Sequence, residues 1–91
     1  KIIDNKYYII RTGDFATNAN KKIIYSLIMI SNTLALVIFG AGGIGRRIYD
    51  ILSDDPNIKI IGFIDNDTQK HGTFYNGIEI YDPQDIQKLD F

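Results

Sequence analysis

Three glycines carry the clearest chemical signal in this 91-residue chain. Residues 40–45 read Gly-Ala-Gly-Gly-Ile-Gly, a G-x-G-x-x-G pattern that follows an apolar run. Gly40 would allow a tight turn, Gly42 would let backbone N–H groups approach a pyrophosphate, and Gly45 would let the next helix pack closely. Because a helix N-terminus offers unpaired N–H donors and partial positive charge, the pattern predicts a phosphate-binding turn.

An acidic residue follows at the distance where such a turn uses one. Asp65 lies 20 positions after Gly45 and directly after the strand-like run 58–64. A carboxylate there accepts hydrogen bonds from ribose hydroxyls and repels a 2′-phosphate, so we expect NAD(H) rather than NADP(H) as the ligand. The structural alternative is an aspartate that only caps a turn at the end of a strand.

The elements around the turn have the pattern that would position these residues. Residues 34–39 are all apolar, which is typical of a buried parallel strand. The segment after the turn has helical periodicity, and residues 58–64 predict a second strand. Four apolar residues at helical spacing form the expected buried face of the helix: Ile44, Ile48, Ile51 and Leu52.

The N-terminal third of the chain has weaker signals. Residues 1–11 contain β-branched and aromatic clusters, which predict two short strands around a turn or one irregular strand. A turn is expected at 12–14. A helix over residues 21–30, capped by Asn18 or Asn20, is expected next.

The C-terminal third alternates between loop and regular structure. Residues 66–77 are polar and rich in turn formers, and residues 78–81 alternate in the manner of a short strand. Pro83 suits the first position of a final helix. Ile86 and Leu89 of that helix are expected to face inward.

Together these elements predict an α/β fold, a partial Rossmann-like parallel sheet with flanking helices and an N-terminal strand-and-helix extension. We place the extension at residues 1–33 and the nucleotide-binding module at 34–91. Such a module needs a third parallel strand after its final helix, and the chain ends at Phe91, so we expect it to be truncated. An open sheet edge favours a homodimer.

Composition excludes several classes of protein. The formal net charge is −1 and no basic patch is present, so nucleic acid is not an expected partner. There is no cysteine and a single histidine, so no disulfide framework or metal site is expected. The apolar stretch 23–42 is interrupted by polar residues and reads as a helix and a strand. We therefore expect a cytoplasmic domain that does not itself contact a membrane.

Four segments carry a family resemblance: Phe39–Arg46, Ile61–Asp67, Lys70-His71-Gly72 and Asn76–Tyr81. In this order they resemble the N-terminal part of bacterial nucleotide-sugar epimerases and dehydratases of polysaccharide biosynthesis. They are also similar to modules attached to sugar acyltransferases, glycosyltransferases and FkbM-type methyltransferases. The glycine turn and strand end are comparable with those of the redox-sensing repressor that binds NADH.

The resemblance implies an NAD-type nucleotide or dinucleotide as the ligand, with Asp65 on a ribose and Asn66 beside the adenosine end. The remaining implied cofactor-binding residues surround the phosphates: Gly40, Ala41, Gly42, Gly43, Ile44, Gly45 and Arg46. The related enzymes use a Tyr-x-x-x-Lys pair, and none of the six tyrosines here has lysine four positions on. If the chain belongs to an NAD-dependent epimerase or dehydratase, it is a fragment without the catalytic half, and catalytic residues stay unassigned.

Other interpretations stay open. The ligand could be a nucleotide-diphosphate sugar, or the domain could be a regulatory or oligomerisation module with a nucleotide-sensing or empty site. Residues 65–67 also match the D-x-D of metal-dependent glycosyltransferases, but these enzymes lack the glycine turn. Arg46 and Arg47 lie in the first turn of the helix, where a cation suits a bound anion or is simply solvated. His71 is expected to be a solvated surface residue.

Overall fold

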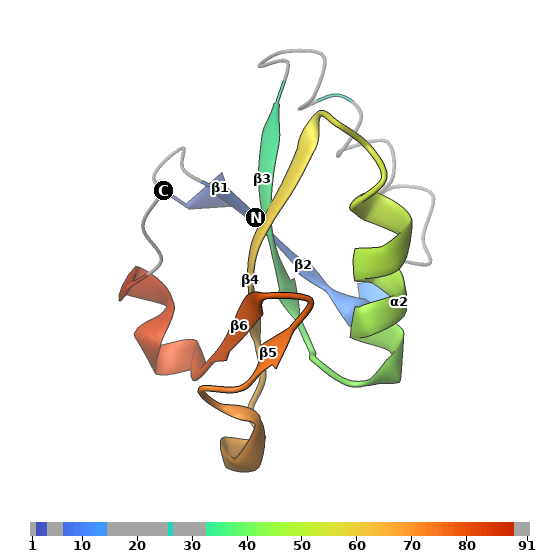
Figure 1. Cartoon of the computed structure of the whole chain (residues 1–91). Coiled ribbons are helices and arrows are strands. Elements are labelled where there is room, and N and C mark those ends of the chain that lie inside the picture. The colour runs from blue at the N-terminus through green and yellow to red at the C-terminus, as the bar shows by residue number, and fades with distance from the viewer. Residues whose placement is uncertain (1, 4–6, 15–25, 27–32, 89–91) are drawn as a thin grey trace.

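The computed structural model describes residues 2–3, 7–14, 26 and 33–88 of the chain. Six strands form one sheet in the order β1-β2-β3-β4-β6-β5 (Figure 1). Their bounds are Ile2–Ile3 for β1, Tyr7–Arg11 for β2, Leu34–Phe39 for β3, Ile58–Ile64 for β4, Phe74–Tyr75 for β5 and Ile78–Tyr81 for β6.

The sheet is mixed, with parallel strands in its centre. β2, β3, β4 and β6 run parallel to one another, whereas β1 pairs antiparallel with β2 and β5 pairs antiparallel with β6. The domain is therefore of the α/β type. The short strand predicted at 78–81 is part of this parallel set, since β6 pairs with β4 through Phe63↔Ile80 and Ile64↔Tyr81.

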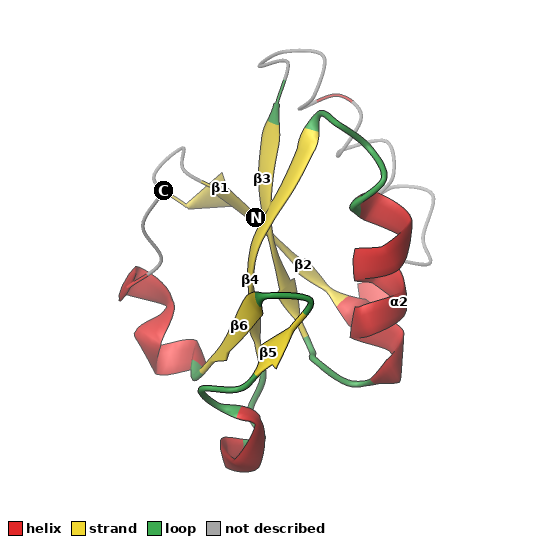
Figure 2. Ribbon diagram, in the orientation of Figure 1, coloured by secondary structure: helices red, strands yellow, loops and turns green. Residues whose placement is uncertain are grey.

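The α-helix α2 and three short 3₁₀ helices accompany the sheet in the described part of the chain (Figure 2). The α-helix, α2, spans Gly43–Leu52, and the 3₁₀ helices are η1 at Thr12–Asp14, η2 at Thr68–Lys70 and η3 at Pro83–Lys88. Figures 1 and 2 show α2 and η3 on opposite sides of the central strands. The final helix expected from Pro83 is thus a 3₁₀ helix.

The central strands bury both of their faces. Leu36 and Ile38 join the larger cluster of buried side chains, which includes Ile48 of α2 and Phe63 of β4. Val37, between them on β3, points to the other face and joins a second cluster. Successive strand residues alternate between faces, so a run that is apolar at every position indicates a strand covered on both sides.

The face that α2 presents to the sheet differs from the expected one. Ile48 is buried as expected, but Ile44 and Ile51 are 67% and 57% exposed. Leu52 packs against the core as expected, and the helix also packs through Gly45 and Tyr49. The physical reason is the close approach at Gly45, which fixes the rotation of the helix and leaves the two isoleucines outside.

A hairpin lies in the region that the sequence pattern assigned to a turn-rich loop. β5 pairs with β6 through Phe74↔Glu79 and Tyr75↔Ile78, so Asn76 and Gly77 form a two-residue connection. Both have positive φ, 50° and 81°, as a type I′ turn requires. The Asn-Gly pair after two aromatic residues was the sequence signal for this hairpin.

Of the predictions for the two ends of the chain, some are confirmed and others fall outside the described residues. The two short N-terminal strands are confirmed, since β1 and β2 pair through Ile2↔Tyr8 and Ile3↔Tyr7. The predicted helix at 21–30 and the inward positions of Ile86 and Leu89 fall outside the described residues or side chains. Within the described part, no helix has the length and apolar character needed to span a membrane.

Candidate functional site

The candidate site lies where the parallel strands end. β2, β3, β4 and β6 all have their carboxyl ends at the same edge of the sheet. The residues that follow these strands are Thr12, Gly40, Asp65 and Asp82. Ligands of open α/β sheets bind at this edge, because the loops that leave the strands gather there.

Gly40 and Gly45 shape the turn between β3 and α2. Gly40 has φ +116°, a backbone conformation that strongly favours glycine, and a Cβ there would lie 2.9 Å from Cγ2 of Thr12. A Cβ on Gly45 would overlap the carbonyl oxygen of Gly40. These contacts match the tight turn and the close helix packing that the pattern predicted.

Gly42 and Gly43 are less crowded: Gly42 is the N-cap of α2 and Gly43 its first residue. A Cβ on Gly42 would lie 3.9 Å from Nζ of Lys70, and among the described residues no heavy atom lies within 4 Å of a Cβ built on Gly43. Among the described residues no side chain caps this helix, and its first turn contains no acidic residue. Because these glycines have no side chains, an anion could reach the N-terminal N–H groups of α2.

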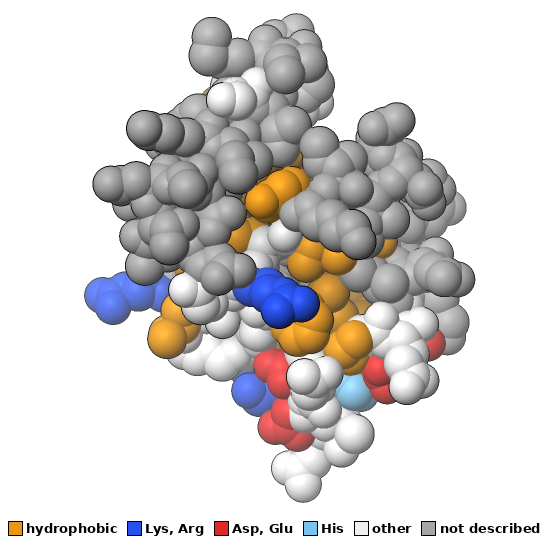
Figure 3. Space-filling model, turned by 180° about the vertical axis from the view of Figure 1, so that it is seen from behind, with side chains coloured by type: hydrophobic (Ala, Val, Ile, Leu, Met, Phe, Trp, Pro, Cys, Tyr) orange, Lys and Arg blue, Asp and Glu red, His pale blue; other side chains and the backbone are white. Residues whose placement is uncertain are grey.

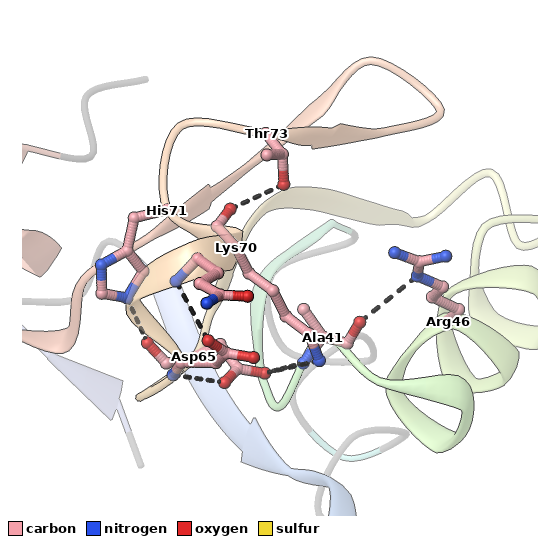
Figure 4. A network of polar contacts seen from close by, with 8 residues as sticks. Ala41, Arg46, Asp65, Lys70, His71 and Thr73 are labelled. Atoms are coloured by element: carbon pink, nitrogen blue, oxygen red, sulfur yellow. Dashed lines mark hydrogen bonds and ion pairs between the residues drawn. The ribbon is translucent and has the colours of Figure 1, made fainter.

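Asp65 closes the turn from the end of β4 (Figure 4). Its Oδ2 accepts a hydrogen bond of 2.7 Å from the backbone N–H of Ala41, and its Oδ1 accepts one of 2.8 Å from the N–H of Asp67. The Nζ of Lys70 lies 3.8 Å from Oδ2. The acid and the glycine turn, 24 positions apart in the sequence, are thus in direct contact.

The surroundings of Asp65 favour its charged form. Burial raises the pKa of this carboxyl, but the N–H groups of Ala41 and Asp67 and the charges of Lys70 and His71 lower it. The lowering contributions win, so the pKa lies below its ordinary value of 3.8. The carboxylate is therefore ionised at neutral pH and can accept further hydrogen bonds.

His71 joins the loops that follow β4 and β6. Its Nε2 is 2.6 Å from the carbonyl oxygen of Asp65, and its Nδ1 is 3.8 Å from Oδ2 of Asp82. The His71 side chain is 21% exposed, so the interpretation as a solvated surface residue is wrong. In Figure 3 acidic side chains lie on both sides of this histidine at the lower end of the molecule.

Arg46 contacts both the glycine turn and the hairpin. Its Nε donates to the carbonyl oxygen of Ala41 at 3.3 Å, and its guanidinium lies 5.0 Å from the centroid of the Tyr75 ring. Tyr75 packs edge-on against Tyr49 and Phe63, and its hydroxyl donates to Asp50. Arg46 therefore ties α2 to the hairpin in this structure, although the sequence pattern made it a candidate for phosphate contact.

The other predicted site residues lie around the same turn. Ile44 is exposed beside the open glycines, and Asn66 is exposed directly after Asp65. Lys70 was missed as a site residue, and the signal that could have found it was the K-x-G loop after the second strand. Among the described residues, no group of three or more His, Cys, Asp or Glu side chains could hold a metal ion.

Comparison with known proteins identifies one family. A family model described as C2185-like, N-terminal, matches residues 32–91, which includes the glycine turn, Asp65 and Lys70. No curated protein and no solved structure matches this chain.

Proposed function

We propose that this chain, which belongs to the C2185-like N-terminal family, binds a nucleotide through phosphate groups at its glycine turn. The contact between the Asp65 carboxylate and the Ala41 N–H, at 2.7 Å, carries the proposal. It brings the acid at the end of one parallel strand to the glycine turn at the end of the adjacent strand. A Rossmann-like dinucleotide site uses the same pair of features, with ribose on the acid and pyrophosphate on the turn.

NAD(H) is the ligand that this arrangement favours. Asp65 is ionised, and two backbone N–H groups leave lone pairs on its oxygens for a ribose hydroxyl. The same charge repels the 2′-phosphate of NADP(H). Asn66, exposed directly after Asp65, would lie beside the adenosine end. A nucleotide-diphosphate sugar shares the diphosphate and is the second ligand class.

The proposed setting comes from the resemblance in residues 39–81. We place the chain in a bacterial, cytoplasmic protein of nucleotide-sugar or polysaccharide biosynthesis, as its nucleotide-binding module. Any oxidoreductase step would use residues outside this chain.

A scaffold role is the competing function, and one observation favours it. Asp65 already accepts from Ala41 and Asp67, so its carboxylate has a structural task without any ligand. Exposed apolar side chains on α2 and β5, among them Ile51 and Phe74, would suit contact with a second copy of the chain. In that case the domain would dimerise and bind no nucleotide.

Calorimetric titration with NADH, NADPH and a UDP-sugar tests the proposal. We expect wild-type chain to bind NADH more tightly than NADPH, and Asp65→Asn to weaken NADH binding at least about tenfold, since a charge-assisted hydrogen bond is lost. Asp54→Asn, at an exposed position, removes the same charge and should leave binding unchanged. Absence of binding to any of the three ligands would contradict the proposal and favour the scaffold.

A further inference from the structure

We infer that Lys70 is the cationic partner of the ligand's phosphate, and that it moves from Asp65 to the phosphate when the ligand binds. This inference rests on the proposed nucleotide site and adds a residue that would bind the phosphate of its ligand.

The position of the Lys70 ammonium carries the inference. Its Nζ lies 3.8 Å from Oδ2 of Asp65 and 3.9 Å from the place where a Cβ on Gly42 would be. The charge therefore sits between the acid and the open glycine (Figure 4). An anion that approached the turn at Gly42 would meet the N–H groups of α2 on one side and this ammonium on the other.

The backbone of Lys70 is fixed from both directions. Its N–H donates to the carbonyl oxygen of Asp67 at 3.0 Å, and its own carbonyl oxygen accepts from Oγ1 and N of Thr73 at 2.6 and 3.1 Å. The Asp67 side chain caps the same short helix through the N–H of Gln69. These contacts aim the lysine at the glycine turn without using its side chain.

The side chain of Lys70, by contrast, is only weakly constrained. It is 34% exposed, and among the described residues it makes one long ion pair, with Asp65. Ion pairs that reach solvent contribute little to stability, so exchanging a carboxylate for a phosphate oxygen costs little. In exchange, the Lys70 ammonium would form a shorter, charge-assisted hydrogen bond to the phosphate, which has a greater negative charge than a carboxylate.

Lys70 would also reduce the repulsion between Asp65 and a bound phosphate. With Asp65 on the ribose and a pyrophosphate on the turn, two anions lie near Ala41, and they would repel each other. The Arg46 side chain already contacts the Ala41 carbonyl and the Tyr75 ring. Lys70 lies between the two anionic positions and would screen one from the other.

The test compares Lys70→Met with Lys59→Met in the 91-residue chain. Both variants lose one lysine, and Lys59 is an exposed residue near the amino end of β4, at the opposite edge of the sheet. Affinity for ADP and for NADH is measured by calorimetry at low and high salt, and circular dichroism checks the fold of each variant. Lys70→Arg tests whether a retained charge preserves binding.

We expect Lys70→Met to weaken the binding of ADP and of NADH about tenfold, because one charged contact is lost. For the same reason the affinity of this variant should depend less on salt concentration. Lys59→Met should behave as wild type and Lys70→Arg should retain most of the affinity. If wild type binds ADP or NADH and Lys70→Met binds equally well, the inference is wrong while the nucleotide site stands. If wild type binds neither, the nucleotide site itself fails, and the inference with it.

Discussion

At the scale of single residues, Asp65 links local chemistry to the whole site. One of its carboxylate oxygens accepts a hydrogen bond from the N–H of Ala41, which follows the adjacent strand β3. The other accepts one from the N–H of Asp67 in the loop that Asp65 itself begins. Because both bonds are stronger to the charged form, the same contacts that shape the turn also favour the ionised carboxylate.

The lowered pKa of Asp65 predicts how stability changes with pH. A carboxyl whose pKa is lower in the folded than in the unfolded chain stabilises the fold fully above the unfolded pKa, about 4. This contribution is lost as pH falls through the folded pKa, below 3.8. In urea unfolding we expect Asp65→Asn to be less stable than wild type at pH 7 and the gap to narrow toward about pH 3. A gap that stays constant over this range would contradict the assigned direction of the pKa shift.

At the scale of elements, α2 is the clearest case. The local pattern predicts where this helix lies, because residues with apolar helical periodicity follow the glycine turn and a polar stretch comes after them. The local pattern does not predict how the helix is rotated about its axis, because a face with Ile44 and Ile51 would also suit the core. The close approach of Gly45 to Gly40 places Gly45 on the inner face, and the two isoleucines are exposed. The smallest residue in the helix therefore sets which face is buried.

A matched pair of glycine substitutions tests this account of α2. A Cβ at Gly45 would overlap the Gly40 carbonyl, so we expect Gly45→Ala to destabilise the domain by at least about 2 kcal/mol. A Cβ on Gly43 would have open space around it, and alanine is the better helix former. The free energy of unfolding of Gly43→Ala should therefore lie within about 0.5 kcal/mol of the wild-type value or above it. Denaturant unfolding measures both. Equal effects of the two substitutions would show that the contact at Gly45 does not control the packing.

At the scale of the whole molecule, the order of the parallel strands follows the chain from β2 through β3 and β4 to β6. β2 lies beside β3 in register, with Ile10 opposite Ile38, and Ile10 belongs to the larger core cluster. The matched family region begins at residue 32, so it leaves out β1 as well as β2, the strand that pairs with β3.

Removing that strand is predicted to be damaging. A chain of residues 33–91 would expose the hydrogen-bonding edge of β3, whose central residues are fully buried in the sheet. An unpaired apolar edge promotes association, so we expect oligomers or aggregates in size-exclusion chromatography and a loss of cooperative thermal unfolding. A shortened chain that stays monomeric and unfolds with wild-type stability would show that β2 is dispensable.

The sequence by itself determined the glycine turn, the strands at 34–39, 58–64 and 78–81, and the helix that follows the turn. Each of these depends on neighbours within a few residues, through apolar period, backbone freedom and turn chemistry. Only the tertiary structure decided which face of α2 is buried, that β6 joins β4 in parallel, and that Asp65 and Lys70 meet the glycine turn. These contacts join residues that are distant in the chain, and their formation depends on how the strands align, which no local pattern specifies.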